Sequence, residues 1–129
     1  NIKNKTIAVW GLTFKPKTDD TRFAPSIDMI EKLISKGAIV QAYDPIGSLK
    51  HIFKRNYKEY NSAINALKNS SALLICTEWK EFWSIDINNF NKYMKESCIF
   101  DGRNIYSPTK FAAYGIKYYG VGRGNDYKD

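Results

Sequence analysis

The stretch that decides the fold is Thr6-Ile7-Ala8-Val9-Trp10, which is followed by a cationic loop at residues 11–22 and a helical pattern at residues 24–36. The short apolar run predicts a buried strand, and apolar residues recur at helical spacing through 24–36. In a strand-loop-helix unit the loop lies at the carboxyl edge of a parallel sheet, where open α/β folds bind ligands. We therefore expect residues 11–22 to form part of a binding site.

The loop at residues 11–22 carries Lys15, Lys17 and Arg22, which favours a negatively charged ligand. It lacks the G-x-G-x-x-G pattern that lets backbone amides approach a pyrophosphate. Any phosphate bound here is therefore expected to be held mainly by long cationic side chains.

Further strand and helix patterns alternate along the chain. Strands are predicted at 38–43, 72–76, 98–100 and 116–121, with helical segments at 62–69, 78–82, 87–94 and after Pro108. This alternation predicts one Rossmann-like three-layer α/β domain over residues 1–129, with a mostly parallel sheet of about five strands. Residues 46–61 are basic and aromatic, and their pattern fits either an irregular loop or an edge strand.

The composition argues against several classes of protein. The 129 residues carry a formal net charge of +7, but the lysines are spread along the chain, which does not favour nucleic-acid binding. No apolar run approaches the roughly 20 residues that a membrane span needs. Cys76 and Cys98 lie in apolar runs and are interpreted as buried, unreactive thiols, and no Cys/His spacing indicates zinc. His51 is expected at the surface.

Four loops that follow strands are rich in polar groups: residues 14–22, 44–45, 77–80 and 101–104. The guanidinium of Arg103 is suited to a phosphate or carboxylate, and an ion pair with Asp101 or another nearby acid explains it equally well. Lys15 precedes Pro16, which holds it extended, yet it fits a solvated loop lysine as well as a ligand contact.

Other acids in these loops also admit two interpretations. Asp44 is comparable to the acid that binds a ribose hydroxyl in dinucleotide folds, but Asp-Pro is also a common turn. Glu78 and Trp79 fit either a pocket wall or the start of a helix beside a packing tryptophan. Asp19 and Asp20 fit a carboxylate pair or, more simply, loop caps. There is no credible catalytic set, so the residues alone indicate an anion-binding Rossmann-like domain.

Five motifs carry a family resemblance. They are Gly11-Leu12-Thr13-Phe14-Lys15-Pro16-Lys17-Thr18-Asp19-Asp20-Thr21-Arg22 with Ala24-Pro25-Ser26, then Ala42-Tyr43-Asp44-Pro45, Thr77-Glu78-Trp79, Asp101-Gly102-Arg103-Asn104 and Tyr119-Gly120-Val121-Gly122-Arg123. In this order they resemble the C-terminal, UDP-binding domain of the UDP-glucose/GDP-mannose dehydrogenase family. The first motif is closer to the UDP-sugar members than to the GDP-mannose members.

The resemblance implies an NAD-dependent, two-step oxidation of a sugar-nucleotide alcohol to a carboxylate, with UDP-glucose as the default substrate and UDP-N-acetylhexosamines as the alternative. It implies that Phe14 and Lys15 contact the substrate, that Arg103 binds the sugar nucleotide, and that Arg22 reaches toward NAD. The family's nucleophile, base and NAD motif belong to N-terminal and central domains that this chain lacks. No residue here is therefore expected to be catalytic, and the chain alone is expected to be inactive.

The resemblance also implies an intact homodimeric enzyme of the bacterial cytoplasm, whose product feeds surface polysaccharides. Its partners would be the UDP-sugar and its own N-terminal and central domains, without nucleic acid or membrane. Two alternatives remain open at this point: a stand-alone nucleotide-binding module, and a flavodoxin- or receiver-like signalling domain.

Overall fold

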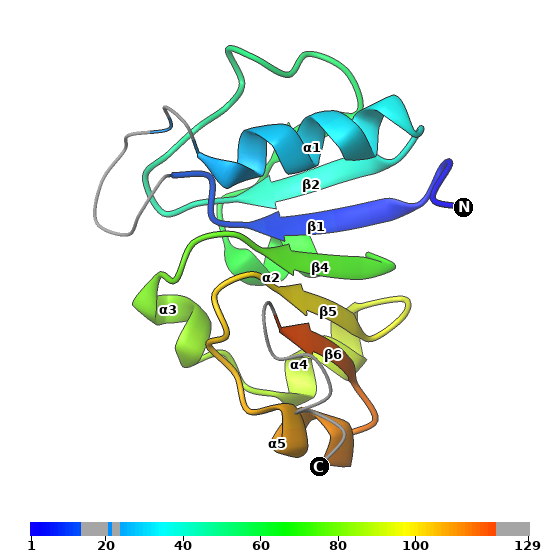
Figure 1. Cartoon of the computed structure of the whole chain (residues 1–129), viewed down its shortest axis with the longest axis vertical. Coiled ribbons are helices and arrows are strands. Elements are labelled where there is room, and N and C mark those ends of the chain that lie inside the picture. Colours follow the sequence, from blue (N-terminus) through cyan, green and yellow to red (C-terminus); the bar gives the residue numbers. More distant parts are fainter. Residues whose placement is uncertain (14–20, 22–23, 121–129) are drawn as a thin grey trace.

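The computed structural model describes residues 1–13, 21 and 24–120. In these residues six strands form one parallel sheet in the order β3-β2-β1-β4-β5-β6 (Figure 1). The strands are β1 (Thr6–Trp10), β2 (Ile39–Tyr43), β3 (Tyr57–Glu59), β4 (Ala72–Ile75), β5 (Cys98–Asp101) and β6 (Lys117–Gly120). The predicted Rossmann-like parallel fold is confirmed.

The sheet has one strand more than the five or so predicted, and the additional strand is β3. It lies in the segment at residues 46–61, for which an edge strand was one of two interpretations. Only three residues long, β3 pairs with β2 through Val40 opposite Tyr57 and Ala42 opposite Glu59. Its side chains are exposed or half-buried. An edge strand that is covered so little by other elements carries no continuous apolar run. For this reason the sequence pattern did not distinguish a strand from a loop in this segment.

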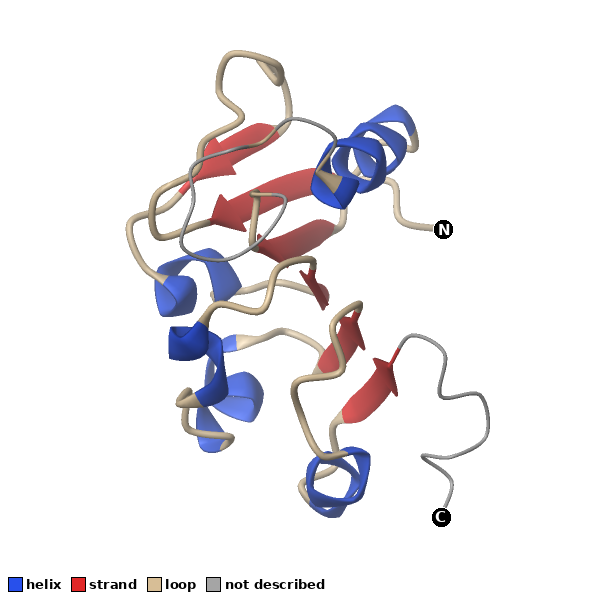
Figure 2. Cartoon of the chain, turned by 60° about the vertical axis from the view of Figure 1, so that its left-hand side comes forward, coloured by secondary structure: helices blue, strands red, loops and turns tan. Residues whose placement is uncertain are grey.

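The helices divide between the two faces of the sheet. Helix α1 (Pro25–Ser35) packs on one face, and the other helices pack on the opposite face (Figure 2). Those other helices are α2 (Ala63–Leu67), α3 (Lys80–Trp83), α4 (Asn88–Tyr93) and α5 (Pro108–Ala113). Because side chains alternate along a strand, Ile7 and Val9 of β1 face α1 while Ala8 and Trp10 face the opposite layer.

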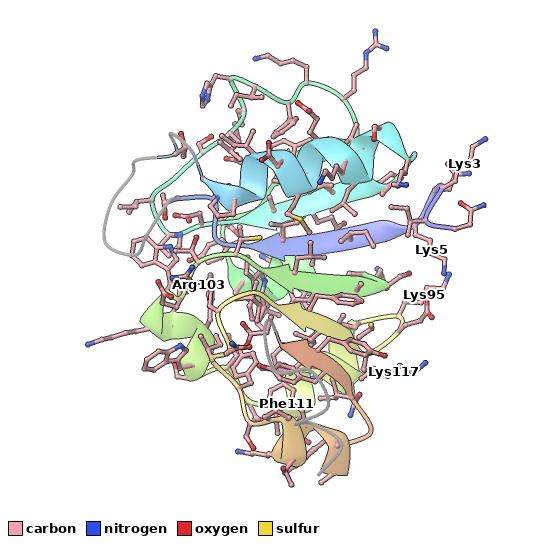
Figure 3. The ribbon with its side chains drawn as sticks, in the orientation of Figure 1. Lys3, Lys5, Lys95, Arg103, Phe111 and Lys117 are labelled. Carbon is pink, nitrogen blue, oxygen red and sulfur yellow. The ribbon has the colours of Figure 1, made fainter. Side chains whose placement is uncertain are left out.

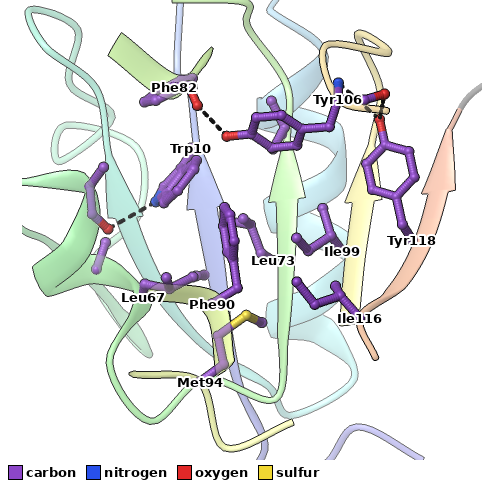
Figure 4. Close-up of a cluster of buried hydrophobic side chains, with 14 of the residues drawn as sticks. Trp10, Leu67, Leu73, Phe82, Phe90, Met94, Ile99, Tyr106, Ile116 and Tyr118 are labelled. Atoms are coloured by element: carbon purple, nitrogen blue, oxygen red, sulfur yellow. Dashed lines mark hydrogen bonds between the residues drawn. The ribbon is translucent and has the colours of Figure 1, made fainter. Parts of the chain in front are cut away.

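Aromatic side chains fill the layer beneath α2 to α5 (Figure 4). The Trp10 ring stacks on Phe82 at 5.0 Å between centroids and lies 5.8 Å from Phe90. The indole Nε1–H of Trp10 donates to the carbonyl oxygen of Ala63 at 3.0 Å, so this buried polar group is satisfied. The Tyr106 hydroxyl likewise donates to the carbonyl oxygen of Phe82. Large apolar rings with satisfied polar tips make this layer a well-packed core.

The strand order has a functional consequence. It is the order of the dinucleotide-binding α/β folds and differs from that of flavodoxin- and receiver-like domains, so the signalling-domain alternative is wrong. In this order the connections after β1 and β4 leave the sheet toward opposite faces, and ligands bind in the crevice between them. The loops that follow β1, β2, β4 and β5 accordingly surround one edge of the sheet.

Candidate functional site

The structure describes only one of the four site residues that the resemblance indicates. Arg103 follows β5 at the carboxyl edge of the sheet, where Figure 3 labels it. Phe14, Lys15 and Arg22 lie outside the described residues, as do Asp19, Asp20 and the end of the chain from Val121. The description of the site therefore rests on the segments that surround this loop and on Arg103.

Asp44 joins three of the loops at the carboxyl edge. Its Oδ2 accepts from the backbone N–H of Leu12 at 2.7 Å and from that of Thr13 at 3.2 Å, both in the loop after β1. The same oxygen accepts from the indole Nε1–H of Trp79, in the loop after β4, at 3.1 Å. One carboxylate thus holds the connections after β1, β2 and β4 together.

A second contact joins the loops after β1 and β4 directly. The Thr77 hydroxyl, which is fully buried, donates to the carbonyl oxygen of Thr13 at 2.7 Å. Gly11 has a φ of +94°, and a Cβ atom at this position would lie 2.6 Å from the side chain of Thr77. Only glycine allows the two loops to approach this closely. The start of the cationic loop is therefore placed by its neighbours before any ligand arrives.

The same contacts decide whether this domain could hold a dinucleotide in the usual way. In dinucleotide folds an acid after the second strand binds the ribose and a glycine-rich turn after the first strand receives the pyrophosphate. Here the other oxygen of Asp44 accepts from the backbone N–H groups of Ile46 and Gly47, at 3.0 and 2.7 Å, so both of its oxygens are bonded within the protein. The turn after β1 also lacks the glycine pattern. The described residues therefore do not fit NAD in the manner of a dinucleotide-binding domain, and the ribose comparison for Asp44 is wrong.

Arg103 forms an ion pair with a nearby acid, which was one of its two interpretations, and that acid is Glu78. Its Nε–H donates to Glu78 Oε2 at 2.6 Å, and the Arg103 side chain remains 39% exposed. Asp101 instead accepts from the backbone N–H of Arg103 at 2.9 Å. The guanidinium therefore lies at the surface of the carboxyl edge with an acid on its Nε side.

Asp101 fixes the turn that carries Arg103. It is 1% exposed, and its Oδ2 accepts from the Tyr118 hydroxyl at 2.5 Å and from the backbone N–H of Ile105 at 2.7 Å. A buried carboxylate is tolerated when its oxygens are hydrogen-bonded in this way. Asn104, which follows Arg103, adopts a φ of 57° that closes the turn. The backbone under the guanidinium is consequently well ordered.

A pocket of about 350 Å³ opens beside Arg103, between the start of α1 and the ends of β4, β5 and β6. Its walls are mainly apolar and include Met29, Cys76 and the stacked pair Phe100 and Tyr119, whose centroids are 5.1 Å apart. Apolar pockets with a few polar groups at the rim are typical of small-molecule sites. Sequence reasoning missed this pocket, because Phe100 looked like an ordinary residue of a buried strand.

The two cysteines are half-buried and not bonded to each other. Burial raises the pKa of the Cys76 thiol to about 12, although the nearby Arg103 guanidinium acts in the opposite direction. Burial also raises the pKa of the Cys98 thiol. Nucleophilic cysteines have a lowered pKa, so both thiols have the properties expected of structural residues.

The two interpretations of Glu78 and Trp79 divide between the residues. Trp79 packs against the aromatic core, as one of them predicted. Glu78 neither starts a helix, since α3 begins at Lys80, nor lines the pocket, and its pairing with Arg103 was not predicted. The sequence did contain a signal for this pairing, because Glu78 and Arg103 each come directly after one of two neighbouring strands.

Four of the lysines lie far from the candidate site. Lys3, Lys5, Lys95 and Lys117 lie at the opposite, amino edge of the sheet (Figure 3). Within the described part of the chain no cluster of His, Cys, Asp and Glu could hold a metal ion, and no helix is both long and apolar enough to cross a bilayer. At the carboxyl edge, the partly exposed guanidinium of Arg103 is the group among the described residues that could contact an anion.

The model of the UDP-glucose/GDP-mannose dehydrogenase family, UDP binding domain, matches residues 8–108. The chain belongs to this family. It is 40% identical over 125 residues to the UDP-glucose 6-dehydrogenase of Rickettsia bellii (strain RML369-C), covering 95% of this chain and 29% of that protein. The chain therefore spans less than a third of the length of the curated relatives it matches.

Solved structures of the family agree with the fold. The structure of UDP-D-ManNAc dehydrogenase from Pyrococcus horikoshii superposes with a TM-score of 0.79 at 30% identity, over 96% of this chain and 27% of that chain. A UDP-glucose dehydrogenase from Pyrobaculum islandicum superposes with a TM-score of 0.76 at 24% identity, over 93% of this chain and 26% of that chain. The second likeness shows the fold alone.

Proposed function

We propose that residues 1–129 form the C-terminal, sugar-nucleotide-binding domain of an NAD-dependent dehydrogenase that oxidises UDP-glucose, or a related UDP-sugar, to the UDP-uronic acid. The observation that carries the proposal is Arg103, an exposed guanidinium on a fixed turn beside an apolar pocket at the carboxyl edge. Membership of the UDP binding domain family and the names of the relatives support it.

In this proposal Arg103 binds the diphosphate of the sugar nucleotide. A planar guanidinium suits this task because its terminal nitrogens match two phosphate oxygens at once. Phe14 and Lys15 contact the same substrate, and Arg22 reaches toward NAD, on the strength of the family motif in which they stand. These three assignments depend on the resemblance, and the Arg103 assignment has the surrounding geometry as additional support.

NAD is bound mainly by an N-terminal domain that this chain does not include. The internal bonding of Asp44 and the missing glycine pattern support this division, since the described residues do not fit a dinucleotide. The chain supplies no catalytic residue and is inactive alone; hydride transfer and covalent chemistry belong to the missing part. The intact protein is proposed to be a homodimer of the bacterial cytoplasm whose product feeds surface polysaccharides.

The test is a titration of the isotope-labelled chain with UDP, GDP and NAD, followed by NMR. We expect UDP to bind in preference to GDP and NAD, and we expect Arg103→Ala to weaken UDP binding at least about tenfold, because a charge-assisted bidentate contact is lost. Lys95→Ala removes the same charge from the opposite edge and serves as the matched control. Equal UDP binding by Arg103→Ala and the unmodified chain would contradict the role of Arg103, and equal binding of all three nucleotides would favour a general nucleotide-binding module.

A further inference from the structure

We infer that Glu78 is the positioning residue of the anion site: its carboxylate holds the Nε side of Arg103 so that the terminal Nη groups face a diphosphate. The inference rests on the proposed function of Arg103 and extends it to a second residue. Glu78 would touch neither the substrate nor the reacting atoms, and it acts only through the guanidinium.

The geometry of the pair supports this role. Glu78 follows β4 and Arg103 follows β5, and the two strands are adjacent and parallel, so their loops leave the sheet side by side. The Nε–H of Arg103 donates to Glu78 Oε2 at 2.6 Å. Among the described residues, Glu78 is the only acid that pairs with this guanidinium. The contact between the two side chains is made by Nε, which leaves the forked Nη groups of Arg103 for a ligand.

Glu78 is itself held on both sides. Its preceding neighbour Thr77 is bonded to the carbonyl oxygen of Thr13, and its following neighbour Trp79 is bonded to Asp44. The backbone at Glu78 is therefore anchored to the loops after β1 and β2, and these anchors are buried or partly buried. A chain of contacts runs from this fixed edge through Glu78 to the exposed Arg103.

The ion pair is expected to strengthen binding because it orients the Arg103 side chain before the ligand arrives. An unpaired arginine side chain samples many rotamers, and fixing it on ligand binding costs conformational entropy. A guanidinium that is already oriented loses less of that freedom when the diphosphate arrives. The negative charge of Glu78 opposes anion binding at the same time, so the effects of its hydrogen bond and its charge must be measured separately.

Two substitutions separate the hydrogen bond from the charge. Glu78→Gln and Glu78→Ala both remove the negative charge, and only glutamine keeps a side-chain oxygen that can accept from Arg103 Nε–H. We expect the Ala variant to bind UDP about two- to fivefold more weakly than the Gln variant, which corresponds to the loss of one exposed hydrogen bond. In the Arg103→Ala background the two Glu78 variants should bind equally. Glu31→Ala, on the exposed side of α1, controls for the loss of one negative charge elsewhere.

A spectroscopic signal gives a readout that a purely structural role would not reproduce. In the ligand-free chain the Arg103 Nε–Hε resonance is expected to move on Glu78→Ala and to stay close to its original position in Glu78→Gln. UDP affinity should follow this signal across the series.

The outcomes distinguish this inference from the proposed function. If the unmodified chain binds UDP through Arg103 but the Gln and Ala variants bind it equally well, the positioning role is wrong and the proposed function stands. If UDP binds without using Arg103, the role of Arg103 and the positioning role of Glu78 are overturned together, and the sugar-nucleotide-binding function stands. If UDP does not bind the unmodified chain at all, the proposed function is overturned as well. Weaker binding by Ala than by Gln that persists in the Arg103→Ala background would also overturn the inference, because Glu78 would then act on something else.

Discussion

The two faces of the sheet are built differently. The face beneath α2 to α5 buries large rings: Trp10, Phe82 and Phe90 are all 0% exposed. The face that carries α1 is aliphatic over β1 and β2, whereas Phe100 and Tyr119 of β5 and β6 remain 45% and 44% exposed. The tightly packed aromatic core and the ligand-sized pocket therefore lie on opposite faces of the same sheet. Both faces contain a buried core, but on the α1 face the core ends before β5 and β6, and this part of the face supplies the pocket beside Arg103.

The largest expected effect is on the packed face. Phe90→Ala should lower the free energy of unfolding by about 3–5 kcal/mol, because it leaves a cavity among rings that cannot all collapse into it. Urea unfolding of the variant measures this loss. Phe100→Ala is the matched control on the open face and should cost less than about 1 kcal/mol. Similar losses for the two variants would contradict the division between the faces.

Asp101 should give the next largest effect, since it closes the packed face at the carboxyl edge. Asp101→Ala removes the acceptor of the Ile105 N–H and the shorter of two contacts of the Tyr118 hydroxyl, which also donates to the Tyr106 carbonyl oxygen at 3.2 Å. The loss of the buried acceptor should cost about 1–3 kcal/mol. Thermal unfolding measures the loss, with the exposed Asp28→Ala as control. A variant that keeps its stability would mean that water replaces the carboxylate in the turn.

The pH dependence of stability tests the surroundings of Cys76. Its thiol lies beside the pocket and is nevertheless shielded from solvent. Burial raises its pKa to about 12, above the value near 8.5 of an unfolded cysteine. The unfolded chain therefore loses this proton first, and the stability contributed by the protonated thiol is present below about pH 8.5 and is lost as pH rises from there toward 12.

Between pH 8.5 and 10 the free energy of unfolding should fall by about 1–2 kcal/mol more in the unmodified chain than in Cys76→Ala. Urea unfolding at several pH values in that window measures the difference. Cys98→Ala, at the start of β5, is the comparison variant: its thiol also has a raised pKa, but the shift is smaller, so its removal should change the pH dependence less. An unchanged pH dependence in Cys76→Ala would show that this thiol is solvated.

Most of the elements could be predicted from local pattern. Residues 24–36 carry the spacing and the proline start of a helix, and α1 occupies 25–35 of them. The strand at 72–76 was recognisable from its continuous apolar run, as expected for a strand covered on both faces. Strand β3 was not recognisable from the sequence, because a three-residue edge strand depends on its hydrogen bonds with β2 rather than on its own burial.

The site was predictable in part. The convergence of the loops after β2, β4 and β5 follows from parallel strands and is confirmed by the contacts of Asp44, Thr77 and Arg103. The partner of Arg103 was not predictable, because several acids follow strands in this chain and local spacing does not choose between them. The role of Asp44 as an internal anchor was missed for the same reason.

The sequence by itself determined the helices, the five longer strands and the family, because periodicity and motifs depend on neighbouring residues. Only the tertiary structure decided that Arg103 pairs with Glu78, 25 residues away, and that Asp44 reaches Leu12 and Trp79, 32 and 35 residues away. It also decided that Phe100 borders a pocket instead of a core. These outcomes depend on strand order and on which half of a face a helix covers, and neither is encoded within any one segment.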